Sequence, residues 1–178
     1  MIETERQYLR PILSKDCHAV FSYRSDKSAN KYQGWIPENL QEVEDFIAKN
    51  PETFNQPDTW FQLVIIEKCS KELIGDIGVH FCGKENKQVE IGCTLNSKHQ
   101  GNGHATEALT HVMEYLFTVL DKHRIITSID PNNTTAINLV ERLGFRKEAH
   151  FAESLFSKGK WIDDLIYACL KKEWKLKK

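Results

Sequence analysis

The stretch Gln100-Gly101-Asn102-Gly103-His104-Ala105 decides how the rest of the sequence is interpreted. Its two glycines allow a tight turn and a close approach of the backbone to a ligand. Apolar residues at helical spacing follow directly, so the loop leads into a helix whose first N–H groups are free. These groups carry the positive end of the helix dipole, which suits a pyrophosphate, and Thr106 can add a hydroxyl donor.

Other phosphate-binding loops fit this stretch poorly. A P-loop has a lysine and a serine or threonine directly after its second glycine, where this chain has His104 and Ala105. The dinucleotide fingerprint needs three glycines within a βαβ unit, whereas a meander is expected before this loop. A plain turn into a helix explains the two glycines equally well, so the loop alone does not decide the ligand.

The sequence on both sides of the loop predicts a mixed α/β fold. Apolar runs indicate strands, and apolar residues repeating every three or four positions indicate helices. The predicted strands span residues 8–12, 60–67, 73–81, 89–95, 124–129, 146–155 and 161–170, and the predicted helices span 15–23, 40–50, 105–120 and 136–143. Ser14 and Asn39 are expected to cap the first two helices, and Gly144 to end the last. The basic end at 171–178 is expected to be a solvated tail.

Length, charge and cysteine content limit the class of protein. The chain has 178 residues, and we expect residues 1–178 to form a single domain. A net charge of −1 gives no general reason to bind nucleic acid or a membrane surface. The apolar runs are too short to cross a bilayer, and the charged first residues lack a signal-peptide core. Five scattered cysteines without a CxxC pair predict free thiols in the cytoplasm.

Motifs along most of the chain resemble those of the GNAT N-acetyltransferase superfamily, and the loop matches its signature Q/R-x-x-G-x-G/A. The matching positions are Glu90-Ile91-Gly92, Gln100 to Ala105, Thr106-Glu107-Ala108, Asn133 and Leu143-Gly144-Phe145. The stretch from Gly159 to Trp174 is similar to the branch that contains the ribosomal-protein N-terminal acetyltransferases.

The resemblance implies an α/β (α+β) fold: a seven-stranded mixed, mostly antiparallel sheet with about four helices. This sheet would splay open between the fourth and fifth strands, at 89–95 and 124–129. Acetyl-CoA would lie in the opening, with its pyrophosphate on the loop and its pantetheine arm along the first of these strands. The residues implied to bind it are Cys93, Thr94, Leu95, Gln100, Gly101, Asn102, Gly103, His104, Ala105, Thr106, Asn133 and Asn138.

The family reaction is direct attack of a neutral amine on the thioester. An alkyl amine titrates near ~10, so it needs a base to remove a proton. Glu90 is the candidate base, because several family members keep a catalytic carboxylate at the start of this strand. Pairing with a neighbouring strand or a lysine is the alternative role of Glu90. A backbone N–H of residues 93–95 would stabilise the oxyanion.

The sequence departs from the family at the leaving-group end. Val140 stands where many members have a tyrosine, and Ala136 where the ribosomal branch often has a serine. A thiol of pKa near ~8.5 can leave unaided, and a water, Thr135 or Asn138 could fill the gap. The alternative functions are a non-catalytic acyl-CoA-binding module on the same fold and a nucleotide-binding regulatory domain.

The acceptor amine is left open, as a protein N-terminus or a small molecule such as an antibiotic, a polyamine or an amino acid. Tyr32 to Trp35 is the candidate acceptor loop. The aromatic candidates for the acceptor pocket, each with a core role as the alternative, are Trp35, Phe54, Trp60 and Trp161. Family habit suggests a homodimer, which no residue demonstrates.

No metal is expected. His104, Glu107 and His111 would share one helix face, but His104 is needed in the loop and His111 is expected at the surface.

Overall fold

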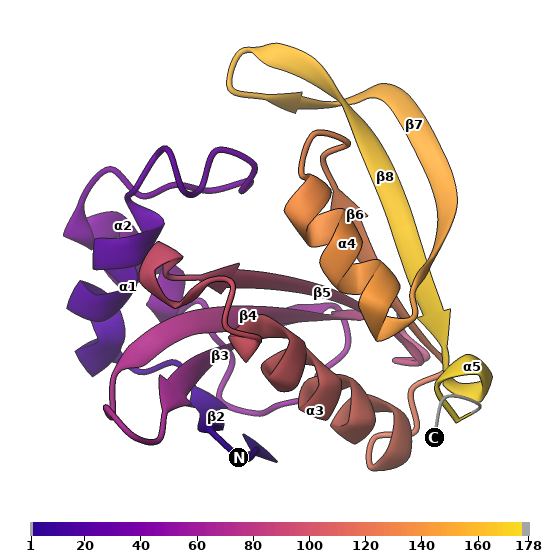
Figure 1. Ribbon diagram of the computed structural model, residues 1–178, viewed down its shortest axis with the longest axis horizontal. Helices are drawn as coiled ribbons and strands as arrows, with labels where there is room; N and C mark the ends of the chain where they lie inside the picture. The colour runs from indigo at the N-terminus through magenta and orange to yellow at the C-terminus, as the bar shows by residue number, and fades with distance from the viewer. Residues whose placement is uncertain (1, 176–178) are drawn as a thin grey trace.

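The computed structural model describes residues 2–175, which build one eight-stranded sheet flanked by helices (Figure 1). The strands are β1 (Ile2–Glu3), β2 (Gln7–Pro11), β3 (Thr59–Glu67), β4 (Leu73–Cys82), β5 (Gln88–Leu95), β6 (Arg124–Ile129), β7 (Arg146–Ser157) and β8 (Lys160–Leu170). The helices are α1 (Cys17–Arg24), α2 (Leu40–Ala48), α3 (His104–Thr118), α4 (Thr134–Leu143) and α5 (Lys171–Lys175), with 3-10 turns at Ser14–Asp16 and Ser97–His99.

The sheet is antiparallel except where β5 meets β6. Its strand order is β1-β2-β3-β4-β5-β6-β8-β7. β5 and β6 run parallel and pair at only three positions, from Gln88 opposite Arg124 to Glu90 opposite Ile126. The rest of β5 has no partner on that side, so the sheet opens as the resemblance implied. The eighth strand is β1, whose two residues are too short to produce a sequence pattern.

Two hydrophobic clusters lie on opposite faces of the sheet. Leu63 and Ile65 of β3 belong to the larger cluster with α3, whereas Val64 and Ile66 belong to the smaller one with α1 and α2. Successive side chains of a strand point to opposite faces, so α3 covers one face and the α1–α2 pair covers the other. β3 therefore reads as a continuous apolar run because both of its faces are buried.

The predicted helix ends are partly confirmed. Asn39 caps α2, where its Oδ1 accepts from the Glu42 N–H at 3.0 Å, and Gly144 ends α4 in a left-handed conformation. The predicted Ser14 cap is wrong, because residues 14–16 form a 3-10 turn and α1 begins at Cys17. The Asp16 carboxylate holds this turn together instead. It accepts from the Leu13 N–H at 2.8 Å and forms an ion pair with Arg10 at 2.6 Å.

The predicted solvated tail is also wrong for the part that the structure describes. Residues 171–175 form α5, and Trp174 is buried in the larger cluster. Its indole N–H donates to Glu114 of α3 at 2.7 Å. A basic composition concealed this anchor, and residues 176–178 lie outside the described part.

All five cysteines are free thiols, as predicted. Among residues 2–175, no helix has the length and apolar character needed to cross a membrane.

Candidate active site

The loop predicted to bind a pyrophosphate leads directly into α3. Gly101 and Gly103 have φ angles of 79° and 80°, a left-handed region that favours glycine. A Cβ on Gly101 would meet no atom within 4 Å, so backbone conformation rather than crowding requires glycine there. Within residues 2–175, the backbone N–H groups of 101–106 bind no intramolecular acceptor, and the helical ladder starts with the Glu107 N–H on the Gly103 carbonyl. These N–H groups are available to an anion.

A cavity of about 1030 Å³ opens beside this loop. β5 contributes Cys93 to Leu95, α4 and the turn before it contribute residues between 132 and 142, and the α1–α2 loop contributes 28–33. The residues expected to bind acetyl-CoA that line it are Cys93, Thr94, Leu95, Gln100, Gly101, Gly103, His104, Ala105, Thr106, Asn133 and Asn138. Asn102 is the one expected residue outside the lining.

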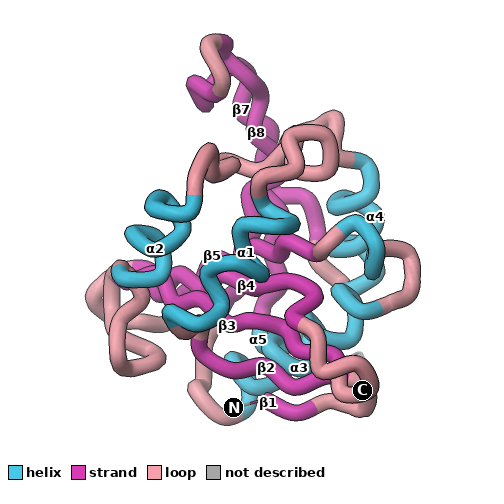
Figure 2. Tube along the Cα trace, turned by 90° about the vertical axis from the view of Figure 1, so that its left-hand side faces the viewer, coloured by secondary structure: helices cyan, strands magenta, loops and turns pink. Residues whose placement is uncertain are grey.

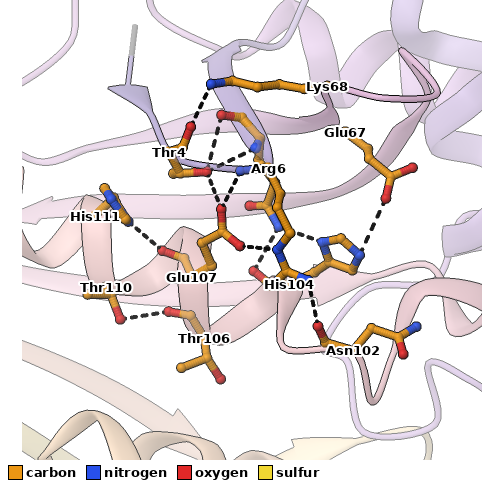
Figure 3. A network of polar contacts seen from close by, with 11 residues as sticks. Thr4, Arg6, Glu67, Lys68, Asn102, His104, Thr106, Glu107, Thr110 and His111 are labelled. Atoms are coloured by element: carbon orange, nitrogen blue, oxygen red, sulfur yellow. Dashed lines mark hydrogen bonds and ion pairs between the residues drawn. The ribbon is translucent and has the colours of Figure 1, made fainter.

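A clamp of Thr4, Arg6 and Glu107 ties the loop to the segment between β1 and β2 (Figure 3). The Arg6 guanidinium donates to Glu107 Oε2 at 2.6 Å and to the Asn102 carbonyl at 3.0 Å. Glu107 Oε1 also accepts from the Arg6 backbone N–H at 2.8 Å and from the Thr4 hydroxyl at 2.5 Å. No local sequence pattern predicts this clamp, because its partners lie about a hundred positions apart.

The electrostatics of the clamp favour an ionised Glu107. Burial by itself would raise the pKa of this carboxyl group. Hydrogen bonds from Thr4 and Arg6, together with the charge of Arg6, outweigh burial and lower the pKa below its ordinary value. The loop is therefore tied to the β1–β2 edge by a charged, multiply bonded carboxylate.

The His104 side chain is turned into the protein, as Figure 3 shows. Its Nδ1 lies 2.8 Å from the Gln7 amide nitrogen, and its Nε2 lies 3.5 Å from Glu67. Burial and the nearby Arg6 charge lower the pKa of His104. His104 therefore offers its backbone N–H, and not a charged ring, to a ligand in the cavity.

The side chains of His104, Glu107 and His111, the candidate metal ligands on one helix face, do not converge on a common point. Glu107 binds Arg6, and His111 Nδ1 lies 2.9 Å from the Glu107 carbonyl of its own helix. The structure instead gathers Glu67, His99 and His104, whose ligand atoms lie within 4.8 Å of one another. The Glu67 carboxylate already accepts from the Ser70 hydroxyl at 2.6 Å.

The α4 side of the cavity carries amides and hydroxyls. Asn133 Oδ1 accepts from the Ala136 N–H at 3.2 Å, which caps α4 and leaves the Asn133 amide N–H₂ for a ligand. Thr135 and Ala136 line the cavity, whereas Val140 is buried in the core. Ala136 is part of the cavity wall, so the serine hydroxyl that the ribosomal branch often has at this position is missing from the cavity itself.

Cys93 lines the cavity but is not suited to nucleophilic attack. Desolvation raises the pKa of its thiol to about 12, so the sulfur is protonated at neutral pH. The arrangement therefore favours a reaction without a covalent enzyme intermediate.

The four candidate acceptor aromatics do not line this cavity. Phe54 packs edge-on against Phe61 and Phe81 in the core, and Trp35 stacks on Phe46. Trp60 and Trp161 are about half exposed. Within the candidate acceptor loop, Tyr32 and Gln33 line the cavity, and Gly34 and Trp35 do not.

The β7–β8 hairpin extends beyond the body of the sheet and approaches the α1–α2 loop (Figures 1 and 2). The Lys158 ammonium near its tip donates to the Lys31 carbonyl at 2.6 Å. Elements far apart in the sequence thus meet above the opening between β5 and β6.

Glu90 lies outside the cavity lining. Its neighbours Val89 and Ile91 are buried in the larger cluster, so Glu90 points to the opposite face, the one covered elsewhere by α1 and α2. Its carboxylate lies 3.7 Å from His80 Nδ1 of β4. Glu90 therefore also makes the contact expected of its alternative role, a pairing with a neighbouring strand.

The family of the chain follows from its matches to known proteins. Residues 6–146 match the model of the acetyltransferase (GNAT) domain. The uncharacterized N-acetyltransferase YnaD of Bacillus subtilis strain 168 is 33% identical over 97% of this chain and 98% of its own length. The chain therefore belongs to the GNAT family and is an acetyl-CoA-dependent N-acetyltransferase.

Other relatives and solved structures agree with this assignment. A GNAT-family acetyltransferase from Bacillus anthracis superposes with a TM-score of 0.87 at 30% identity, over 97% of this chain and 99% of that one. The spermidine N(1)-acetyltransferase of Vibrio cholerae is 25% identical over 87% of each chain. The Escherichia coli ribosomal protein uS5-alanine N-acetyltransferase is 33% identical over 47% of this chain and 43% of its own, so the similarity to that branch is partial.

Proposed function

We propose that this protein transfers the acetyl group of acetyl-CoA to a primary amine by direct attack of the amine on the thioester. The observation that carries the proposal is the loop at 101–106, whose unpaired N–H groups border a cavity of about 1030 Å³ between β5 and α4. This volume is slightly above the usual range of about 300–1,000 Å³ for small-molecule and cofactor pockets.

The coenzyme is assigned to this cavity in one orientation. Its pyrophosphate binds the N–H groups at the start of α3, where the helix dipole favours negative charge. Its pantetheine arm lies along Cys93 to Leu95, on the edge of β5 that β6 leaves unpaired. Asn133, directly before α4, and Asn138 of α4 bind the arm. The Vibrio cholerae spermidine N-acetyltransferase, whose structure with CoA and spermine superposes with a TM-score of 0.82, supports the fold alone at 22% identity.

The chemistry needs a base for the amine and a proton for the departing sulfur. Glu90, on the open face of β5, is proposed to help remove the proton from the amine. Thr135, which lines the cavity, or a water is proposed to protonate the sulfur, because Ala136 offers no hydroxyl. A thiolate of pKa near ~8.5 requires little assistance, so the missing hydroxyl is compatible with turnover.

The acceptor is proposed as a small amine or a protein N-terminus. The relatives support both classes, because one is named for spermidine and another for the alanine of a ribosomal protein. We also propose that residues 1–178 work as one domain in the cytoplasm, in keeping with five free thiols. The homodimer stays a prediction that light scattering can test.

Two experiments test the proposal in sequence. Acetyl-CoA should raise the melting temperature of the protein, and ATP and NAD should not. A thiol-release assay over a panel of polyamines, amino acids, aminoglycosides and peptides with free N-termini should then show turnover with one class. Stabilisation without turnover on any amine would favour the non-catalytic acyl-CoA-binding module. No stabilisation by acetyl-CoA would refute the cofactor assignment.

A further inference from the structure

Two titratable side chains outside the acetyl-CoA cavity face each other on neighbouring strands. His80 of β4 lies directly opposite Glu90 of β5 in the antiparallel register. The distance from His80 Nδ1 to Glu90 Oε2 is 3.7 Å, and the two side chains are 28% and 30% exposed. Both groups can therefore exchange protons with solvent and with each other through a small shift or a single water.

The His80 ring is held in a defined plane. The Trp60 indole of β3 stacks on it with centroids 4.7 Å apart and an interplanar angle of 8°. On its own strand, the Cys82 sulfur lies 3.6 Å from His80 Nδ1. Burial raises the pKa of the Cys82 thiol, which keeps it neutral, and Asp58 acts on that thiol from further away. The Glu90 carboxylate is thus the charged group paired directly with the imidazole.

One face of β5 runs from this pair to the cavity. Glu90, Gly92 and Thr94 share one face of β5, because side chains alternate along a strand. A Cβ on Gly92 would meet no atom within 4 Å, so the space above it is free, and Thr94 lines the acetyl-CoA cavity. The neighbouring Gly78 of β4 is covered instead, with the Gln62 amide 2.9 Å from an added Cβ. An amine above Gly92 would lie between the cavity and the pair.

We propose that His80 is the base that removes the proton from the acceptor amine, and that Glu90 is a positioning residue that orients the ring and stabilises the imidazolium. This inference rests on the proposed function and refines the role given there to Glu90. General bases work best when their pKa is near the working pH, and an imidazole in water titrates near ~6.5 against ~4.3 for a glutamate. A carboxylate beside an imidazole is the arrangement that other enzymes use to orient a histidine base.

The proton and bond changes balance without a further reactant. The ammonium form of the acceptor gives one proton to His80 Nε2. The neutral nitrogen attacks the thioester carbon, the C–N bond forms, and the C–S bond breaks as the tetrahedral intermediate collapses. The second nitrogen-bound proton passes to the CoA sulfur through water, and the His80 imidazolium returns its proton to solvent. The products are the amide, free CoA and one released proton.

The decisive experiment compares the pH dependence of kcat/KM in His80→Gln and Glu90→Gln, with the amine found in the panel assay. His80→Gln should lower kcat/KM by about 10²-fold and abolish the acidic limb that reports the base. Glu90→Gln should keep that limb and lower kcat/KM by only about tenfold, because the base remains and only its orientation is lost. The exposed His123 before β6 provides the control: His123→Gln should leave the profile unchanged.

The opposite pattern would overturn the inference. If Glu90→Gln abolished the limb while His80→Gln kept both the limb and the rate, Glu90 would be the direct base. NMR titration of His80 in the native protein adds a measurement that needs no variant, and its midpoint should coincide with the kinetic limb in the free enzyme. The proposed function fails separately, if the native protein releases no thiol. Acetyl-CoA affinity should stay unchanged in both variants, because neither residue lines the cavity.

Discussion

Replacing Glu107 by glutamine should weaken coenzyme binding by loosening the loop at 101–106, although Glu107 itself also lines the cavity. In the native protein the Glu107 carboxylate accepts three hydrogen bonds, from the Thr4 hydroxyl, the Arg6 backbone N–H and the Arg6 guanidinium (Figure 3). A glutamine can keep the two bonds to Oε1. Its amide N–H₂ would face the guanidinium, which loses its acceptor while still holding the Asn102 carbonyl.

The size of the effect follows from the exposure of the two partners. Hydrogen bonds to charged groups contribute about 1.5–3 kcal/mol when shielded from solvent. The Glu107 side chain is 14% exposed and that of Arg6 is 43% exposed, so solvent screening reduces this to about 1–2 kcal/mol. If this free energy keeps the loop in its binding conformation, CoA affinity should fall by about 5- to 30-fold.

Calorimetry with two ligands separates loop bracing from general damage. By calorimetry, the Kd of Glu107→Gln for CoA should rise, and the Kd for S-acetyl-pantetheine, which has no pyrophosphate, should stay within about twofold. Glu44→Gln, which changes an exposed carboxylate on α2, is the matched control and should alter neither value. An unchanged CoA affinity in a folded Glu107→Gln protein, or an equal loss for both ligands, would refute the bracing role.

Three further outcomes are expected. Ala136→Ser places a hydroxyl on the cavity wall and should raise kcat by about 2- to 10-fold; initial rates that stay equal or fall would show that protonation of the sulfur is not limiting. The pKa of His104 is lowered in the folded state, so its stabilising contribution is complete above pH ~6.5 and is lost as the pH falls. The melting temperature of His104→Gln should therefore decline less between pH 7 and 5 than that of the native protein. Trp174→Ala should cost about 3–5 kcal/mol in chemical denaturation, whereas a cost below about 1 kcal/mol would indicate that α5 is only loosely attached.

Local patterns were sufficient for most of the fold. The central strands and the long helix each carry a clear hydrophobic period, and Asn39 caps a helix for a reason visible within four residues. Elements fixed by distant partners were not predictable in this way. Asp16 displaced the Ser14 cap because it also binds Arg10, and Trp174 turned a basic tail into a helix because it reaches Glu114.

The candidate site divides along the same line. The loop at 100–106 is contiguous, so its spacing is visible in the sequence. With the family resemblance, eleven of the twelve residues assigned to acetyl-CoA were placed along one cavity. The Arg6–Glu107 clamp and the His80–Glu90 pair join separate elements, and only strand register and packing bring them together. The sequence could not show which aromatic residues reach a pocket, because it does not show which of them are buried. Phe54 lies in the core, whereas Trp60 lies at the surface.

The central claim is that the N–H groups at the start of α3 bind the diphosphate of CoA. Calorimetric titration of CoA into Gly103→Glu tests it most directly, with Gly103→Ala as the control for strain at a φ of 80°. We predict a loss of about tenfold for alanine and more than about 100-fold for glutamate, whose charge would oppose the phosphates. A folded Gly103→Glu protein that bound CoA as tightly as the native chain would contradict the assignment.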